Sequence, residues 1–340
     1  MMKIILILLL LLNISACSKE PTLQEKLFEL GYDQEDIEYI ELLDESKQEM
    51  FLEGYNDKLI SLMKTNGYRD DNLDRYLKYY GEFENEKLIE LVNNNMLNDS
   101  NVKILKEMYA SDYFIKNNEE LYLKYLGKYE SLRKTMEVVN TKRYKELFSD
   151  ISPNDVSKDY LMLVNKYYQL PSDYEPDDLV YVEDEYGRGM TRERVYEAFK
   201  KLHDDALDLG YNIVVVSAYR SYDYQQGLYD MYCESDPAEV VDTYCARPGL
   251  SEHQTGLCLD VSIPGLSIDD FYMCGAAPWL EENAPKYGFI IRFPKDKEDI
   301  TGYQWESWHI RYLGEQVAQD VYDRHITYDE YYACFVEDYE

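Results

Sequence analysis

Apolar and charged side chains recur at helical spacing through the first part of the chain. From about residue 22 to residue 150 the sequence is rich in Leu, Ile, Tyr, Lys and Glu, has almost no proline, and is interrupted by Gly or Asn roughly every ten to twenty residues. This pattern predicts a string of short helices. We therefore expect an all-α domain over residues 17–150.

Similar short pieces recur within this helical region. The stretch LGYDQEDI at 30–37 resembles NGYRDDNL at 66–73, and YLKYYG at 76–81 resembles YLKYLG at 122–127. Such recurrence is typical of helical repeats that stack on their neighbours. A composition biased towards Tyr, Leu and Lys also produces such matches by chance, so both interpretations stay open.

The pattern changes near residue 150, where prolines and aspartates mark a boundary. Beyond it, the spacing predicts a helix over 191–208 that Gly210 closes. The β-branched run YNIVVVSAYRS predicts a buried strand, and LCLDVSI and WHIRYL predict further strands. Because helices and strands do not alternate regularly, we expect an α+β domain built on a largely antiparallel sheet over residues 151–340.

The first residues form a separate segment. Lys3 precedes an apolar run that is too short for a membrane span and is typical of a secretory signal. The run ends in Ile-Ser-Ala before Cys17, which resembles a bacterial lipoprotein cleavage site. We expect a signal peptide over 1–16 and an extracytoplasmic protein that a lipid on Cys17 anchors to the bacterial cell membrane. An uncleaved anchor with an incidental Cys17 is the alternative.

Charge and cysteine content narrow the classes of function. The formal net charge of −32, from 67 acidic and 35 basic residues, argues against nucleic acid or an anionic membrane surface as a partner. Beyond Cys17, five cysteines remain, and none has the CxxC spacing of a cysteine metal site. Disulfides can persist outside the cytoplasm, and the pairs that we consider are Cys233 with Cys245 and Cys274 with Cys334.

The candidate chemistry lies around two of the four histidines. His253 lies in SEHQTGLCLD and His309 in WESWH. In the predicted strand LCLDVSI, alternation places Asp260 opposite the apolar row of Leu257, Leu259 and Val261. A carboxylate in an apolar stretch is costly unless it is paired or binds a cation, and two imidazoles with one carboxylate form a catalytic zinc set.

A zinc site of this kind also needs a base. A fourth position holding water would give a nucleophile, because the metal lowers the pKa of that water towards about 7. Glu306 lies three residues before His309, which is close enough for it to accept the proton of that water without being a ligand itself. The alternative is that both histidines are buried in ordinary polar networks.

Five pieces of the chain, in order, carry a family resemblance: LMLVNKYYQLPSDYEPDDLV, SAYRSYDYQQGLY, ARPGLSEHQTGLCLDVSI, WLEENAPKYGFIIRFPKDKEDITGY and WESWHIRYLG. Over roughly residues 160–330 the chain resembles the zinc-dependent D-alanyl-D-alanine carboxypeptidases of the vancomycin-resistance type, which have the hedgehog/DD-peptidase fold. The combination of Ser-x-His-x-x-Gly-x-x-x-Asp with Glu-x-x-His carries this resemblance.

The resemblance implies roles for individual residues. It implies that one zinc ion is bound by His253, Asp260 and His309, and that Glu306 is the catalytic base. It further implies that Arg220 binds the carbonyl oxygen or the substrate carboxylate, for which its permanently charged guanidinium is suited. Two more residues match positions that hydrogen-bond substrate, namely Gln225 and Ser251.

One cysteine and two histidines of the predicted domain are expected to have no role in the chemistry. Cys258 stands where the family usually has alanine, and we expect it to be a neutral buried thiol. His203, in a helical segment, and His325, in the C-terminal segment, match no motif, and we interpret both as structural or solvated.

We thus expect a metallocarboxypeptidase that removes the terminal D-alanine from peptidoglycan stem peptides. An L,D-carboxypeptidase acting on tetrapeptide stems is an alternative that the motifs do not separate from it. A catalytically silent cell-wall-binding lipoprotein is another, which the intact ligand set disfavours. The helical N-terminal domain is expected to position the enzyme or to contact another protein.

Overall fold

A computed structural model describes residues 20–54 and 56–337. The predicted signal segment and Cys17 lie outside these ranges. Within them, no helix combines the length and the apolar character that a membrane span requires.

The first part of the described chain is helical, as its periodicity predicts. Polar side chains begin several of these helices: Thr22, Asp33, Asp44 and Asn56 each accept a hydrogen bond from a backbone N–H of the first turn, which satisfies a group that has no partner inside the helix. The helices are α1 (Leu23–Leu30), α2 (Gln34–Glu41), α3 (Glu45–Leu52), α4 (Asp57–Lys64), α5 (Leu73–Lys78), α6 (Asn85–Asn93), α7 (Val102–Tyr109), α8 (Glu119–Tyr125) and α9 (Leu132–Asn140).

Two of the similar sequence pieces occupy equivalent structural positions. Tyr76 of α5 donates its hydroxyl hydrogen to Asn93 Oδ1 at 2.5 Å, and Tyr122 of α8 makes the same contact with Asn140. A short 3-10 turn precedes each of these tyrosines, and an asparagine from that turn binds the same acceptor in both cases. The shared contacts favour a degenerate helical repeat over chance similarity of composition.

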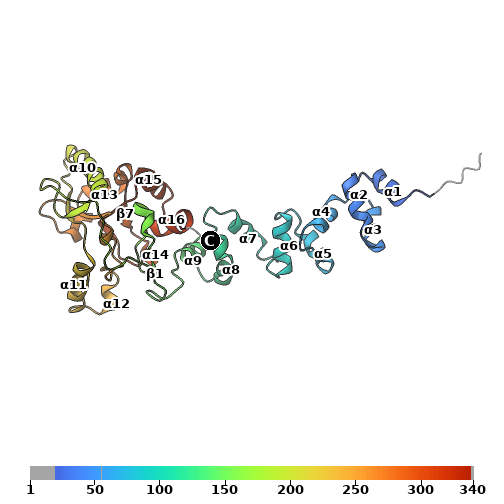
Figure 1. The fold of residues 1–340 in the computed structure, drawn as a ribbon, viewed down its shortest axis with the longest axis horizontal. Coiled ribbons are helices and arrows are strands. Elements are labelled where there is room, and N and C mark those ends of the chain that lie inside the picture. Colours follow the sequence, from blue (N-terminus) through green and yellow to red (C-terminus); the bar gives the residue numbers. More distant parts are fainter. Residues whose placement is uncertain (1–19, 55, 338–340) are drawn as a thin grey trace, which may run out of the picture. The chain divides into compact units, whose positions relative to one another are not determined.

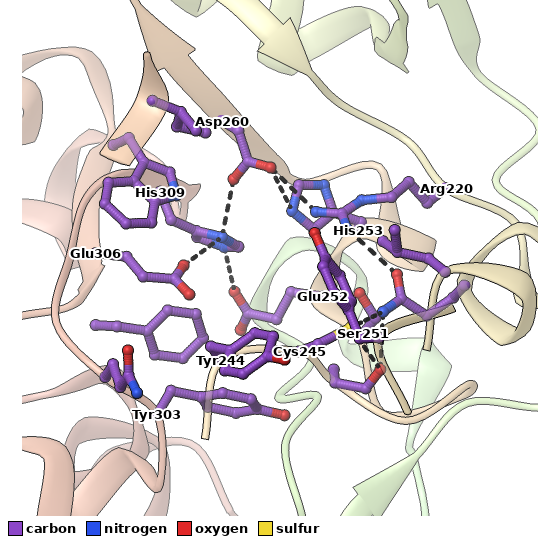
Figure 2. Close-up of a pocket in the computed structure, with 18 of the residues that line it drawn as sticks. Arg220, Tyr244, Cys245, Ser251, Glu252, His253, Asp260, Tyr303, Glu306 and His309 are labelled. Atoms are coloured by element: carbon purple, nitrogen blue, oxygen red, sulfur yellow. Dashed lines mark hydrogen bonds and ion pairs between the residues drawn. The ribbon is translucent and has the colours of Figure 1, made fainter. Parts of the chain in front are cut away.

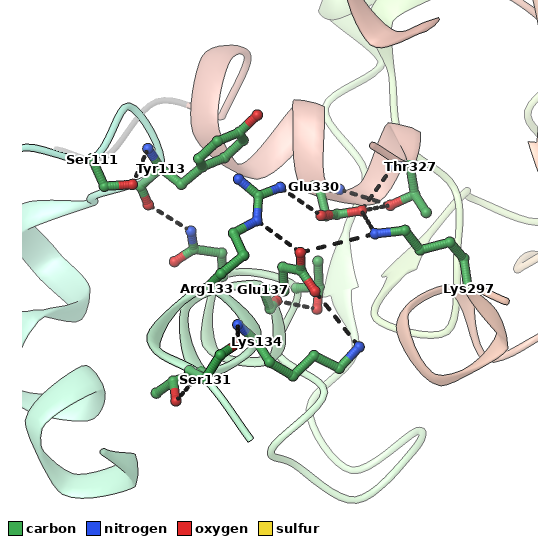
Figure 3. A network of polar contacts seen from close by, with 12 residues as sticks. Ser111, Tyr113, Ser131, Arg133, Lys134, Glu137, Lys297, Thr327 and Glu330 are labelled. Carbon is green, nitrogen blue, oxygen red and sulfur yellow. Dashed lines mark hydrogen bonds and ion pairs between the residues drawn. The ribbon is translucent and has the colours of Figure 1, made fainter. Parts of the chain in front are cut away.

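The chain divides into two compact units, 1–107 and 108–340. This division comes earlier than the predicted domain boundary at 150, and it groups α8 and α9 with the strands that follow. Ion pairs within the second unit explain the grouping. Arg133 of α9 pairs with Glu330 at 3.3 Å, and Lys297 pairs with the same buried carboxylate at 3.2 Å. Figure 3 shows Glu137 of α9 beside both cations.

The second unit is built on an antiparallel sheet of four strands in the order β5-β6-β8-β7, which confirms the α+β prediction. Three strands fall where the sequence predicts them, and β7 was not predicted. The sheet consists of β5 (Val214–Ser217), β6 (Cys258–Ser262), β7 (Phe289–Phe293) and β8 (Glu306–Tyr312). Two small sheets lie outside it, formed by β1 (Ser152–Pro153) with β2 (Tyr168–Gln169) and by β3 (Leu179–Tyr181) with β4 (Met190–Arg192).

One face of this sheet is apolar and carries the core. Leu257, Leu259 and Val261 pack there with side chains of α10 (Glu193–Asp208) and α13 (Ala276–Asn283), and Figure 1 shows these two helices in the same region of the second unit. The remaining helices are α11 (Tyr222–Cys233), α12 (Ala238–Val241), α14 (Glu298–Thr301), α15 (Glu315–Asp323) and α16 (Tyr328–Phe335). Because side chains alternate along a strand, the core on one face directs Asp260 to the other.

We predict that Leu259→Ala lowers the free energy of unfolding of the second unit by about 2–5 kcal/mol, because it removes a fully buried side chain and leaves a cavity. Chemical denaturation followed by circular dichroism measures the change. Leu209→Ala, at an exposed leucine just after α10, is the matched control, with an expected change within about 0.5 kcal/mol. Equal losses for both variants would contradict the packing described above.

Candidate metal and peptidase site

His253 is positioned by a short 3-10 turn, Glu252–Thr255, that leads into β6. Its Nδ1 lies 2.6 Å from the carbonyl oxygen of Ala218, so this nitrogen carries the hydrogen and Nε2 is free to act as a ligand. The turn ends at Gly256, whose backbone is left-handed with φ 65°. A Cβ there would lie 3.0 Å from a carbon of Arg192, so glycine suits both the conformation and the space.

Asp260 and His309 face each other across two strands. They are register partners in the β6–β8 ladder, and Asp260 Oδ1 lies 3.2 Å from His309 Nδ1. The other carboxylate oxygen lies 3.2 Å from His253 Nε2. Figure 2 shows the carboxylate between the two imidazoles. Ligands of a tetrahedral zinc ion lie roughly 3.3 Å apart, and the aspartate lies at this spacing from each imidazole, through a different oxygen in each case.

Glu306 begins β8 on the same side of the cluster. Its Oε2 lies 3.4 Å from His309 Nδ1, and Figure 2 shows its carboxylate directed towards that nitrogen. This is the position that a proton acceptor needs if it is to act beside a metal without being a ligand.

The predicted substrate-binding residues adjoin this cluster. Arg220 Nη2 lies 3.0 Å from Asp260 Oδ2, and its Nη1 lies 3.4 Å from the side-chain oxygen of Gln225. Gln225 is buried and donates to the carbonyl oxygen of Ala246 at 2.8 Å, so it also holds the loop that passes in front of it. Ser251 is buried directly before the 3-10 turn of His253.

A cavity of about 460 Å³ brings all seven predicted site residues together along its wall. Several of their buried polar atoms have no hydrogen-bond partner among the described residues: Arg220 Nε, His253 Nε2, Asp260 Oδ1 and His309 Nε2. Unsatisfied buried polar atoms are costly. Their concentration here fits a site that binds a cation and a polar substrate, so the donor set of the site suits zinc.

The charges in the cluster stabilise one another. Burial opposes ionisation of Asp260, but His253, His309 and Arg220 together hold its pKa well below the usual range. Burial also disfavours the imidazolium form of His309, whereas the Cys258 thiol and Asp260 raise its pKa well above the ordinary value. A cation bound between these groups would take the place of the proton, so metal binding competes with protonation.

Cys258 lies beside this cluster, on the face of β6 that also carries Asp260. Among the residues that the structure describes, one group of three potential metal-binding side chains has its ligand atoms within 4.8 Å of one another, and it consists of His253, Cys258 and His309. Asp260 is not in this group, although each of its oxygens contacts one of the imidazoles. Burial opposes ionisation of the Cys258 thiol, whereas the two histidines lower its pKa to about 7. The neutral state that we expected for this thiol stays a prediction.

The two cysteine pairs that we considered are wrong. Cys233, Cys245, Cys274 and Cys334 are all free thiols. A disulfide requires a specific separation of the two Cβ atoms, which the spacing of cysteines in a sequence does not reveal.

His203 and His325 lie outside the site, as expected. His203 is buried in α10, where its Nδ1 lies 2.6 Å from the carbonyl oxygen of Ile213. His325 is exposed after α15.

The sequence reasoning missed Glu252, which lies directly behind His309. Its Oε2 is 3.6 Å from His309 Nε2, on the side of the ring opposite the predicted metal-binding nitrogen. Its other oxygen accepts from Arg292 Nε at 2.7 Å and from Arg311 Nη1 at 2.8 Å, and Arg292 continues to Asp329 at 2.6 Å. Glu252 thereby brings the negative charge of this buried network close to the imidazole of His309 without a hydrogen bond to it.

Tyr303 is a second residue that the sequence did not single out. It is buried against the cavity, and its hydroxyl has no hydrogen-bond partner among the described side chains. The ammonium group of Lys166 lies 3.7 Å from the centre of its ring. No local sequence pattern indicates a role for Tyr303, because its contact with Lys166 joins segments that are far apart in the sequence.

Comparison with known proteins identifies the class. The family model for VanY, a D-alanyl-D-alanine carboxypeptidase, matches residues 189–315. A bifunctional D-Ala-D-Ala dipeptidase and D-Ala-D-Ala carboxypeptidase, VanXYC of Enterococcus gallinarum, is 32% identical over 177 residues, which are 51% of this chain and 93% of that protein. The chain therefore belongs to the VanY-type D-alanyl-D-alanine carboxypeptidase family, as the motifs indicated.

Two further relatives refine the comparison. A putative carboxypeptidase of Bacillus subtilis (strain 168), YodJ, is 41% identical over 181 residues, which are 51% of this chain and 66% of that protein. The solved structure of the LdcB LD-carboxypeptidase has a TM-score of 0.51 and 38% identity, covering 55% of this chain and 92% of that one, which confirms the predicted fold. The match spans slightly less than two thirds of YodJ and of two enterococcal D-alanyl-D-alanine carboxypeptidases.

We predict that Glu252→Gln destabilises the second unit by about 3–5 kcal/mol, because it leaves two buried guanidinium groups without their shared carboxylate. Thermal or chemical unfolding measures this. Glu197→Gln is the control, since it removes an exposed pair with Lys200 and should change stability by about 0–1 kcal/mol.

We also predict that the stability difference between wild type and Glu252→Gln depends on pH. Burial raises the pKa of Glu252, but Arg292 and Arg311 outweigh it and hold the pKa in the folded state well below the usual range. A lowered pKa stabilises the folded state fully above the unfolded-state pKa of about 4.3 and progressively less as the pH falls through the folded-state value. The difference in unfolding free energy between wild type and Glu252→Gln should therefore shrink below about pH 4. A difference that grows on acidification would contradict the network.

Proposed function

We propose that this protein is a zinc metallocarboxypeptidase that removes the C-terminal D-alanine from peptidoglycan stem peptides. One observation carries the proposal: two imidazoles, two carboxylates and a guanidinium from separate segments meet at one cavity, where several of their buried polar atoms have no hydrogen-bond partner among the described residues. Membership of the VanY-type family supports it.

In this proposal His253, Asp260 and His309 hold one zinc ion. The ion would lower the pKa of a water molecule and polarise the scissile carbonyl. Glu306 takes the proton of the attacking water and returns it to the leaving amine, because its carboxylate lies beside the ligands and borders the cavity. Glu252 places a buried negative charge next to Nε2 of His309, on the side of the ring away from the metal-binding nitrogen.

Arg220 is the anchor for the substrate's negative charge. Its guanidinium is shared between Asp260 and Gln225, and its Nε is buried without a partner among the described residues. A carboxylate or a developing oxyanion in the cavity would satisfy that donor at little cost. Gln225 and Ser251 border the same part of the wall, where they can hydrogen-bond the terminal residue.

Cleavage of tetrapeptide stems, after an L-residue, is the second candidate function. The observation that favours it is the likeness to the LdcB LD-carboxypeptidase in both sequence and structure. The D,D reaction is preferred because the matching family model and several relatives carry that activity in their names.

To test the function, the purified full chain, loaded with zinc, is incubated with synthetic pentapeptide and tetrapeptide stems, with and without a chelator. Mass spectrometry follows the products. Loss of one D-alanine from the pentapeptide, abolished by the chelator, is expected. Cleavage of only the tetrapeptide would establish the L,D reaction instead, and no cleavage by zinc-loaded protein would favour a silent binding protein.

We predict that Glu306→Gln retains zinc but lowers kcat by about 10²–10⁴, because the proton acceptor is lost while the ligands remain. His309→Ala should lose both zinc and activity. Elemental analysis of the purified variants and initial rates on the preferred stem measure the two effects. Glu281→Gln, at an exposed glutamate of α13, is the control and should behave as wild type. Full activity of Glu306→Gln would rule out the assigned base.

We further propose that the protein is extracytoplasmic and lipid-anchored through Cys17, with the helical domain positioning the peptidase or contacting a partner protein. The support is the sequence pattern before Cys17 and the nature of the substrate, which lies outside the membrane. Metabolic labelling with a radioactive fatty acid should mark the wild-type protein and not Cys17→Ser. Equal labelling of both would contradict the anchor.

A further inference from the structure

Lys166 is a buried lysine that belongs neither to the proposed metal site nor to the charge network around Glu252. It is 2% exposed, and its Nζ donates to the backbone carbonyl oxygen of Asp242 at 2.5 Å. No ion pair to its ammonium group is seen among the residues that the structure describes. A buried charge is costly unless other groups stabilise it, so the remaining contacts of this ammonium group are informative.

Two aromatic rings lie close to the ammonium group of Lys166. Its Nζ is 3.7 Å from the centre of the Tyr303 ring and 5.2 Å from the centre of the Phe148 ring. A cation at this distance is attracted by the negative charge on the face of an aromatic ring. A Cβ at Gly302 would lie 2.7 Å from Lys166 Cε. The glycine before Tyr303 therefore leaves the room that the lysine needs to reach the ring.

Charged and titratable groups around Lys166 set its ionisation. Burial lowers its pKa to about 7, Asp242 and Cys245 raise it, and Arg143 and Arg247 lower it further. The ammonium form, which the ring attracts, therefore predominates below about pH 7 and is lost above it.

Tyr303 connects this cation to the wall of the cavity. It lies three residues before Glu306, and Figure 2 shows it among the side chains that surround the cavity. Its ring packs against Phe293 at 4.7 Å between centroids, and Phe293 packs against His309 at 4.9 Å. Its hydroxyl is buried without a hydrogen-bond partner among the described residues. Burial raises the pKa of Tyr303 well above its ordinary value, so the hydroxyl keeps its hydrogen and can donate it.

We propose that the Tyr303 hydroxyl donates a hydrogen bond to a peptide oxygen of the bound stem, and that Lys166 is the positioning residue that fixes the tyrosine ring for this contact. The inference rests on the proposed function and adds a substrate contact to it. A buried donor without a partner is costly, and a bound peptide oxygen removes that cost. Lys166 is not among the described residues that line the cavity, so it acts through the ring of Tyr303.

A double-mutant cycle on the zinc-loaded full chain tests the pair. Wild type, Tyr303→Phe, Lys166→Met and the double variant are assayed on the preferred stem at about pH 6, where the ammonium form predominates. Tyr303→Phe should raise KM by about three- to tenfold and change kcat less than about twofold, because a hydrogen bond of the bound substrate is lost. Lys166→Met, which keeps the length of the side chain without its charge, should raise KM by about two- to fivefold. In the double variant, Lys166→Met should add no further increase.

Lys200→Met is the matched control. Lys200 also lies over a tyrosine ring, 4.8 Å from the centre of the Tyr196 ring, but neither residue is among the described ones that line the cavity. This variant should keep the KM of wild type. Thermal unfolding and zinc content are measured for every variant. A lower unfolding temperature of Lys166→Met with an unchanged KM would show that the lysine only stabilises the fold, and would overturn its positioning role.

The outcomes separate this inference from the function on which it rests. Release of D-alanine by wild type with an unchanged KM for Tyr303→Phe would overturn the inference and leave the proposed function intact. Tyr303→Phe removes a single oxygen atom, so this arm decides even if Lys166→Met does not fold. Equal increases of KM on Lys166→Met in the presence and absence of the hydroxyl would overturn the positioning role.

A wild type that holds zinc but releases no D-alanine from either stem would overturn the proposed function. Calorimetric titration of the same four proteins with the two stem peptides then tests the pair without catalysis. Weaker binding in both single variants, with no additional loss in the double variant, would support the inference. Equal binding by all four proteins would overturn it.

Discussion

The site depends on one buried carboxylate, that of Glu252. Two guanidinium groups, from Arg292 on β7 and Arg311 on β8, converge on one of its oxygens at 2.7 and 2.8 Å. Burying such charges is costly unless each is paired and hydrogen-bonded. Glu252 therefore ties the turn that carries His253 to the two strands at one end of the sheet.

The same network connects segments that are distant in the sequence to the surroundings of the histidine ligands. Arg292 also binds Asp329 of α16, and Asn165 donates to the other oxygen of that aspartate at 2.8 Å. α16 in turn supplies Glu330, which joins α9 through Arg133. Through these two neighbouring residues of α16, charged contacts link α9 to Glu252, which lies 3.6 Å from His309 Nε2. This gives a physical reason why α9 belongs to the same compact unit as the sheet, although it comes before the predicted boundary.

Local patterns were sufficient for the parts of the site that lie on one strand. Alternation in LCLDVSI placed Asp260 opposite the core, because the periodicity of a strand needs no knowledge of its neighbours. The Ser-x-His-x-x-Gly-x-x-x-Asp spacing around His253 was similarly visible in the sequence. The register of Asp260 with His309 was not, since it depends on which strands pair. Glu252, Tyr303 and strand β7 were missed for the same reason: their roles arise from contacts between segments far apart in the chain.

Under the proposed function, the same ligand cluster serves both candidate reactions. Both candidate reactions break a peptide bond to a terminal D-alanine, so the metal ligands, Glu306 and Arg220 face the same groups in either case. What differs is the residue before that bond, which is D-alanine in one stem and an L-residue in the other. Discrimination must therefore come from the cavity wall beyond the cluster, where Tyr232, Tyr244 and Trp305 lie. Because a methyl group and a longer side chain differ in the apolar surface that they bury, packing against these rings would contribute to the selectivity of the proposed enzyme.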